Sequence, residues 1–188
     1  MSKNLRKTLG NVDDELVQEL MNLIDTQSKA TVARWCAEFV ADVVLPICEK
    51  HIPGDDRPRR MLMAAVDCAE GKIKFAGVKN IRVSEWTKPP ELAANPAAMA
   101  AARAIIDTAC MVWQTPTHSL GCLWYAGAAV AYDKLGLNAT DAEYDAVANN
   151  VLVDYLTRLK AVAVENEPKP LNCKWGCVNA NIVTPPVF

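Results

Sequence analysis

Two long apolar segments, each opening with a helix-start signal, constrain the fold of this chain more than any other feature. Residues 95–113 read NPAAMAAARAIIDTACMVW, in which Asn95 suits the N-cap of a helix and Pro96 its first position. Thr115 and Pro116 repeat this signal, and the apolar segment that follows runs to Gly136, a residue suited to ending a helix. The short connection between the two segments predicts a pair of antiparallel helices.

The helical pattern continues on both sides of this pair. Residues 12–24 and 57–70 place apolar side chains on one face, and Gly71 suits the end of the second segment. The segment from Ser28 onward contains Pro46, which predicts a kink or a break into two helices. A capping box, Thr140 to Glu143, opens a further helix. Residues 72–90 alternate too briefly to form a sheet and are predicted to be an irregular connection.

These segments predict an all-α protein, a compact bundle of about six antiparallel helices, with stacked helical hairpins as the other arrangement. The length of 188 residues suits a single helical domain spanning residues 1–188. Residues 1–10 carry basic side chains without an acid and are expected to form a flexible N-terminal arm. Residues 166–188 have no helical period, so we expect a non-helical, extended C-terminal arm packed on the bundle.

The net charge and the cysteine content indicate the cellular compartment and the class of partner to expect. A formal net charge of −2 argues against a nucleic-acid partner, which calls for a basic face. The longest apolar run, residues 120–132, is too short to span a bilayer, and residues 1–17 contain no apolar signal segment. The seven cysteines are odd in number and lie mostly in apolar stretches, as in proteins of a reducing cytosol. We therefore expect a cytoplasmic protein without a membrane partner, and leave a homo-oligomer open.

Few residues offer catalytic or metal chemistry. Cys173 and Cys177 form the one cysteine pair with ligand-like spacing, but a structural zinc site needs two more ligands. His51 and His118 lie far apart in the sequence, so we expect the chain to hold no metal or cofactor. Cys173, Cys177 and His118 are the weak candidates for metal ligands. The sequence contains no nucleophile elbow, phosphate-binding loop or dinucleotide fingerprint. A non-enzymatic protein is the expectation, and a small metal-binding protein or enzyme the alternative.

Other residues are candidates for contact with a protein partner. Trp86 lies in the charged loop RVSEWTKPP, whereas Trp113 and Trp124 fall on apolar helix faces and are predicted to fill the core. His118 falls in the first turn of a predicted helix, where exposed N–H groups can bind an anion.

The stretch DDRPRR opens the predicted helix 57–70. Asp55 or Asp56 suits its cap, and Pro58 suits its first turn. Positive charge at this end opposes the helix dipole, so Arg57, Arg59 and Arg60 are expected to pair with nearby carboxylates, with partner contact as the alternative.

The residues from about 30 to 135 resemble a bacterial family of putative immunity proteins, immunity protein 5-like, which is associated with polymorphic toxin systems. The resemblance is carried by Trp35, Leu45-Pro46, Asp55 to Arg60, Gly71, Ala101-Ala102-Arg103 and the TPTH sequence that ends in His118. Three positions depart from the family pattern: Gly54 precedes the acid pair, Pro116 replaces a threonine, and Cys122 stands where a second histidine is expected.

The resemblance implies a small helical protein that binds and neutralises a toxin or effector domain and needs no active site of its own. A phage or mobile-element protein that inhibits a host defence complex would use the same binding chemistry. The gene neighbourhood distinguishes these two.

Overall fold

A computed structural model describes residues 5–74, 76–78, 94–173 and 175, except for the side chain of Trp113. These residues form seven α-helices and one π-helical turn, and no strand occurs among them. The elements are α1 (Glu15–Thr26), α2 (Lys29–Phe39), η1 (Val40–Val44), α3 (Leu45–His51), α4 (Arg57–Ala69), α7 (Pro96–Trp113), α8 (His118–Leu135) and α9 (Asp141–Val162). The all-α prediction is confirmed.

Most of the predicted helix ends are also confirmed. The Asn95 side chain accepts the Ala98 N–H at 3.0 Å at the start of α7, and the reciprocal capping box of Thr140 and Glu143 opens α9. Gly136, with φ at +69°, ends α8.

The predicted cap at Thr115 is wrong, because α8 begins only at His118 and its N-cap, Thr117, makes no side-chain capping bond. The N–H groups of His118 and Ser119 instead bond to the carbonyls of Thr115 and Pro116. This tighter, three-residue spacing shows that the chain forms a turn before α-helical spacing is established.

The break expected at Pro46 is found as a change of helix type. Proline has no N–H to donate to the preceding turn, so a regular α-helix cannot continue through it. The structure accommodates this with the π-helical turn η1, after which α3 begins with Pro46 in its first turn.

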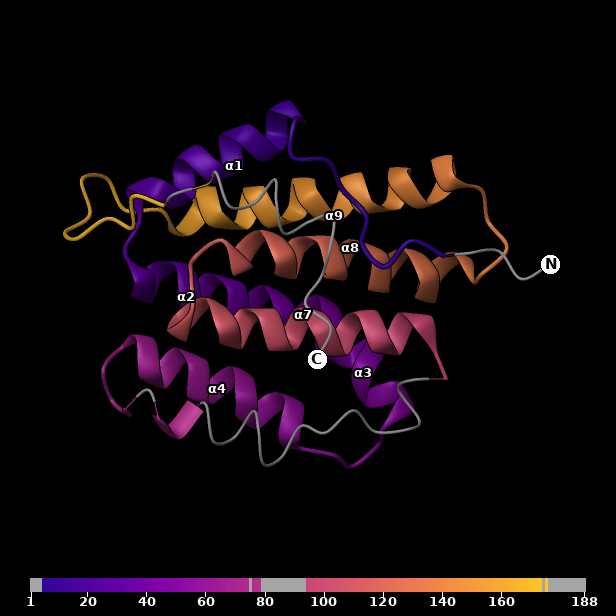
Figure 1. Cartoon of the computed structure of the whole chain (residues 1–188), viewed down its shortest axis with the longest axis horizontal. Coiled ribbons are helices and arrows are strands. Elements are labelled where there is room, and N and C mark those ends of the chain that lie inside the picture. Colours follow the sequence, from indigo (N-terminus) through magenta and orange to yellow (C-terminus); the bar gives the residue numbers. More distant parts are fainter. Residues whose placement is uncertain (1–4, 75, 79–93, 174, 176–188) are drawn as a thin grey trace.

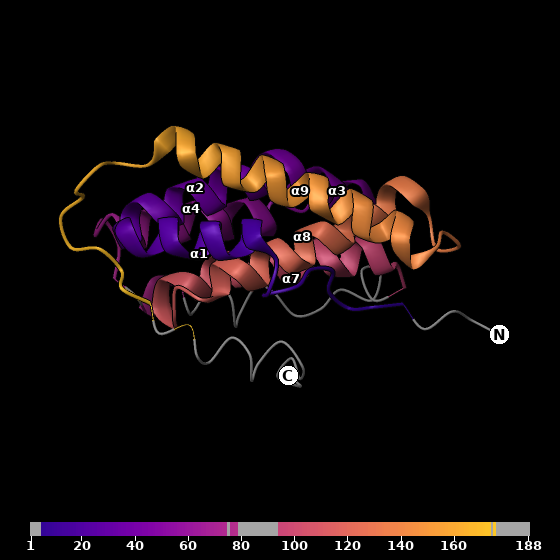
Figure 2. The same ribbon diagram turned by 90° about the horizontal axis from the view of Figure 1, so that it is seen from above.

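The helices pack as a bundle around α2, α7 and α8. α7 and α8 lie side by side along their lengths, and α9 covers α8 from the other side (Figures 1 and 2). Small residues permit this close approach: a Cβ added at Gly127 on α8 would lie 3.2 Å from the Cβ of Ala148 on α9. In Figure 1, α1 and α9 run along one edge of the bundle and α4 along the opposite edge. No described helix is both long enough and apolar enough to cross a membrane.

Tyr155 joins α9 to α2 and α8 in the middle of the core. Its ring lies 4.0 Å from the ring centre of Trp35 and 4.6 Å from that of Phe39, and the side chain is fully buried. The Tyr155 hydroxyl lies 3.0 Å from the Cys36 sulfur and donates to the Ser119 carbonyl at 3.1 Å. Burial raises the pKa of this phenol well above its ordinary value, so it stays a neutral donor.

Residues 5–10, predicted to belong to a flexible arm, lie against the bundle. Leu9 is 1% exposed, and its N–H donates to the carbonyl of Trp124 at 3.2 Å. Gly10 has φ at +146°, and a Cβ there would overlap the Trp124 ring. The Tyr132 hydroxyl donates to the Arg6 carbonyl at 2.6 Å. Leu9 therefore holds this segment against the bundle. In the sequence, the basic residues around Leu9 had suggested a free segment instead.

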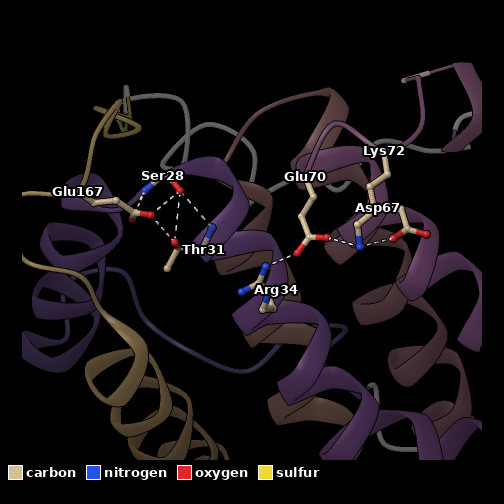
Figure 3. A network of polar contacts seen from close by, with 7 residues as sticks. All are labelled: Ser28, Thr31, Arg34, Asp67, Glu70, Lys72 and Glu167. Carbon is tan, nitrogen blue, oxygen red and sulfur yellow. Dashed lines mark hydrogen bonds and ion pairs between the residues drawn. The ribbon is translucent and has the colours of Figure 1, made fainter.

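The segment after α9 has no helix over residues 163–173 and contacts the corner between α1 and α2. Glu167 accepts hydrogen bonds from the Ser28 N–H at 2.6 Å, the Ser28 hydroxyl at 2.8 Å and the Thr31 hydroxyl at 2.5 Å (Figure 3). Partial burial acts to raise the pKa of Glu167, but these hydrogen bonds outweigh it and the pKa lies below its ordinary value. A carboxylate from the C-terminal segment thus supports the N-terminus of α2.

Candidate functional site

The charged stretch before α4 forms a local network of acids and arginines. The Asp55 carboxylate accepts the backbone N–H of Arg57 at 3.0 Å and also pairs with its guanidinium. This hydrogen bonding holds the pKa of Asp55 below its ordinary value. Asp56 occupies the N-cap position without a capping bond from its side chain, and Pro58 is buried in the first turn. Asp55 is therefore the carboxylate that supports this helix start.

The other two arginines also pair with acids of the chain. Arg59 lies 2.9 Å from Glu49 on α3, and Arg60 lies 3.9 Å from Asp56. The expected ion pairs are confirmed. The pairs are solvent-exposed, with side-chain exposures of 57% for Arg59 and 49% for Arg60, and such pairs contribute little to stability. Breaking the exposed Arg59–Glu49 pair therefore costs little free energy.

Met63 completes an exposed surface on the same helix. It lies four residues after Arg59 and three after Arg60, so the three side chains share one side of α4. Met63 is 62% exposed, the highest value among the large apolar side chains found exposed in the described residues. Arginine and methionine are both enriched in protein–protein interfaces. We call the surface made by Arg59, Arg60 and Met63 the α4 outer face.

The far end of α4 is held by a second charged network. Glu70 pairs with Arg34 on α2 and lies 2.6 Å from Lys72, which also approaches Asp67 at 3.3 Å (Figure 3). The hydrogen bond from Lys72, followed by that from Arg34, lowers the pKa of Glu70 below its ordinary value. Gly71, with φ at +79°, ends the helix as predicted. The α4 outer face is thus carried on a helix with polar contacts at both ends.

His118 belongs to a different cluster, between α7 and α8. Its Nδ1 lies 3.2 Å from Asp107 Oδ1, and its Nε2 lies 2.8 Å from Gln114 Oε1. The amide nitrogen of Gln114 approaches the Cys110 sulfur at 3.8 Å. We call Asp107, Cys110, Gln114 and His118 the α7–α8 polar cluster.

A cation and an aromatic ring extend this cluster along the two helices. The Arg103 guanidinium lies over the Tyr125 ring, 5.5 Å from its centre. Burial, and then the charge of Asp107, raise the pKa of Tyr125 above its ordinary value. Two residues of the family resemblance, Arg103 and His118, therefore lie on neighbouring helices along one interface. Sequence reasoning missed Asp107 and Gln114, although Asp107 lies three residues before Cys110 on the same face of α7 and Gln114 follows as the C-cap of that helix.

The remaining predicted site residues lie elsewhere. The Cys173 N–H donates to Asp25 on α1 at 2.8 Å, and the possible metal-ligand group found among the described residues does not include Cys173. Cys177 and Trp86 lie outside the described residues. Trp124 is buried, as predicted for a core residue.

The α7–α8 polar cluster holds the residue types of a thiol nucleophile, its base and an orienting acid. Cys110 is only 2% exposed, so its sulfur offers no attacking face to a substrate. Two hollows, of about 330 and 610 Å³, lie beside residues 6–14 and beside the segment 163–172, and the cluster lines neither of them.

Comparison with known proteins assigns the family. No curated protein and no solved structure is significantly similar to the chain. A model of the Imm-5 like putative immunity protein family matches residues 22–155. The match extends beyond residues 30–135, over which the sequence motifs indicate the resemblance, and takes in α2, the α4 outer face and the α7–α8 polar cluster. Because it spans well over half of the chain, the protein belongs to the Imm-5 like putative immunity protein family.

Proposed function

We propose that this protein binds a toxin or effector domain and neutralises it by occupying its functional surface, without catalysing a reaction. The observation that carries the proposal is the family match over residues 22–155, since a protein that confers immunity has a protein target. Free, buried thiols at Cys36, Cys48 and Cys122 suit a reducing compartment, so we place the activity in the cytoplasm.

We further propose that the α4 outer face contacts the target. A partner carboxylate can replace Glu49 at Arg59, since exposed ion pairs rearrange with little change in free energy. Met63 then supplies an apolar anchor between two cations. A target that presents acids around an apolar recess has the matching chemistry.

Co-expression with the toxin domain encoded beside the gene tests the proposed function. The intact chain should restore growth of cells that express the toxin and should co-purify with it. Growth arrest despite abundant soluble protein would contradict the proposal, as would protection without a physical complex.

Two matched substitutions test the surface. Met63→Asp introduces a charge on the α4 outer face, whereas Val153→Asp introduces one on α9, where the side chain is 45% exposed. These helices lie on opposite edges of the bundle (Figure 1). Met63→Asp should abolish protection and Val153→Asp should preserve it, with both proteins equally soluble. The reverse pattern would place the contact elsewhere.

A further inference from the structure

The α7–α8 polar cluster has the composition and spacing of a site for a transition-metal ion. One ligand atom each from Asp107, Cys110 and His118 lies within 4.8 Å of the other two. A carboxylate, a thiolate and an imidazole together are ligands that Zn²⁺ accepts, whereas Mg²⁺ and Ca²⁺ prefer oxygen alone. Zn²⁺ bonds of about 2.0–2.3 Å place neighbouring tetrahedral ligands roughly 3.3–3.7 Å apart, close to the 3.2 Å between His118 Nδ1 and Asp107 Oδ1.

The helix pair brings these groups together from two elements. Asp107 and Cys110 are three residues apart and share a face of α7, and the turn before α8 returns His118 beside them. Gly121 on α8 leaves the space that the Asp107 carboxylate occupies, because a Cβ there would lie 2.2 Å from Asp107 Oδ2.

The hydrogen bonds of His118 are compatible with metal binding at one ring nitrogen. The Gln114 amide oxygen lies 2.8 Å from His118 Nε2, so the tautomer with its hydrogen on Nε2 donates to it. In a neutral ring, Nδ1 then presents a lone pair to the Asp107 carboxylate at 3.2 Å. A metal ion bound to Nδ1 in this tautomer can also take a carboxylate oxygen of Asp107 as a ligand. A metal-binding histidine that donates its other N–H to an oxygen has this same arrangement.

Exposure leaves a route to the site. Cys110 is buried beneath the cluster, while the side chains of Asp107 and His118 are 17% and 25% exposed. The sulfur therefore lies beneath the two ligands that solvent reaches. We propose that Asp107, Cys110 and His118 bind one Zn²⁺ ion, with water as the fourth ligand. This set replaces Cys173 and Cys177 as the metal-binding partners of His118.

Titration of the chelator-treated protein with Co²⁺, a coloured substitute for Zn²⁺, tests the proposal. One equivalent should produce thiolate-to-cobalt charge-transfer bands and intense tetrahedral d–d bands, and Zn²⁺ should displace them. Cys110→Ser should remove the thiolate bands, and His118→Ala should weaken Co²⁺ binding on the order of 100-fold. The matched variants Cys68→Ser and Cys173→Ser/Cys177→Ser should keep the full spectrum.

A further variant covers the case in which Cys110→Ser fails to fold. Gly121→Ala removes no ligand, but its methyl group displaces the Asp107 carboxylate, so it should weaken Co²⁺ binding while circular dichroism stays unchanged. Absence of bands in the intact protein would overturn the proposal. Bands lost in Cys173→Ser/Cys177→Ser but kept in His118→Ala would equally overturn it.

Discussion

Removing the hydroxyl of Tyr155 should destabilise the protein far less than removing its ring. In Tyr155→Phe the contacts with Trp35 and Phe39 remain, and the hydroxyl's interactions with the Ser119 carbonyl and the sulfurs of Cys36 and Cys122 are lost. A net loss of about 1 kcal/mol in the free energy of unfolding follows. Tyr155→Ala removes a fully buried ring and leaves a cavity, for a loss of about 3–5 kcal/mol.

Urea unfolding followed by circular dichroism measures both losses. A chain of 188 residues shifts its Tm by roughly 2–4 °C per kcal/mol, so thermal melts should fall by about that amount for Tyr155→Phe and several times more for Tyr155→Ala. Tyr144→Phe is the control, because its hydroxyl donates to the carbonyl of the exposed Gly136, where water can take its place, so the loss should be smaller. Equal losses for Tyr155→Phe and Tyr155→Ala would refute the view that ring packing joins α9 to α2.

Three further predictions concern the terminal segments and the thiols. Gly10→Ala should release residues 5–10 from Trp124 because its methyl group overlaps the ring, and limited proteolysis should then cleave within these residues; an unchanged digest would contradict that contact. Glu167 has a pKa below its ordinary value, so its contribution to stability is full at neutral pH and is lost as the pH falls through that lowered pKa. In Glu167→Gln, the difference between the Tm at pH 7 and the Tm at pH 3 should therefore be smaller than in the intact protein. The same pH dependence in both proteins would exclude this role. Burial raises the pKa of Cys48 and of Cys122 to about 12, so iodoacetamide at pH 8 should leave both unmodified in the folded protein, as mass spectrometry can check; rapid labelling of either would contradict its burial.

Features of the fold that depend on local chemistry were predictable. Asn95 and Thr140 start helices because their side-chain oxygens bond to N–H groups three residues ahead, and Pro46 interrupts one because it lacks an N–H. The start of α8 was misplaced at Thr115 because serine and threonine bond equally well to a turn and to a helix N-terminus.

The contacts that position the candidate site were not predictable in the same way. The ligand-like spacing of Cys173 and Cys177 suggested these two cysteines as metal candidates beside His118, whereas the antiparallel return of α8 along α7 places Asp107 and Cys110 next to His118. Likewise, Leu9 lies in a basic terminal segment of the sequence, and only the structure shows its contact with Trp124 of α8. Contacts between segments far apart in the chain depend on how the helices pack, and the periodicity of apolar side chains does not specify that packing.

The most direct test of the proposed inhibition is the affinity of the purified chain for the toxin domain encoded beside its gene, measured by isothermal titration calorimetry. The intact chain and Val153→Asp should bind with the same affinity and a one-to-one stoichiometry. Met63→Asp on the α4 outer face should weaken binding by on the order of 100-fold, the scale of an interface hot spot of about 3 kcal/mol. No detectable binding by the intact chain, or equal affinities for all three proteins, would contradict the account.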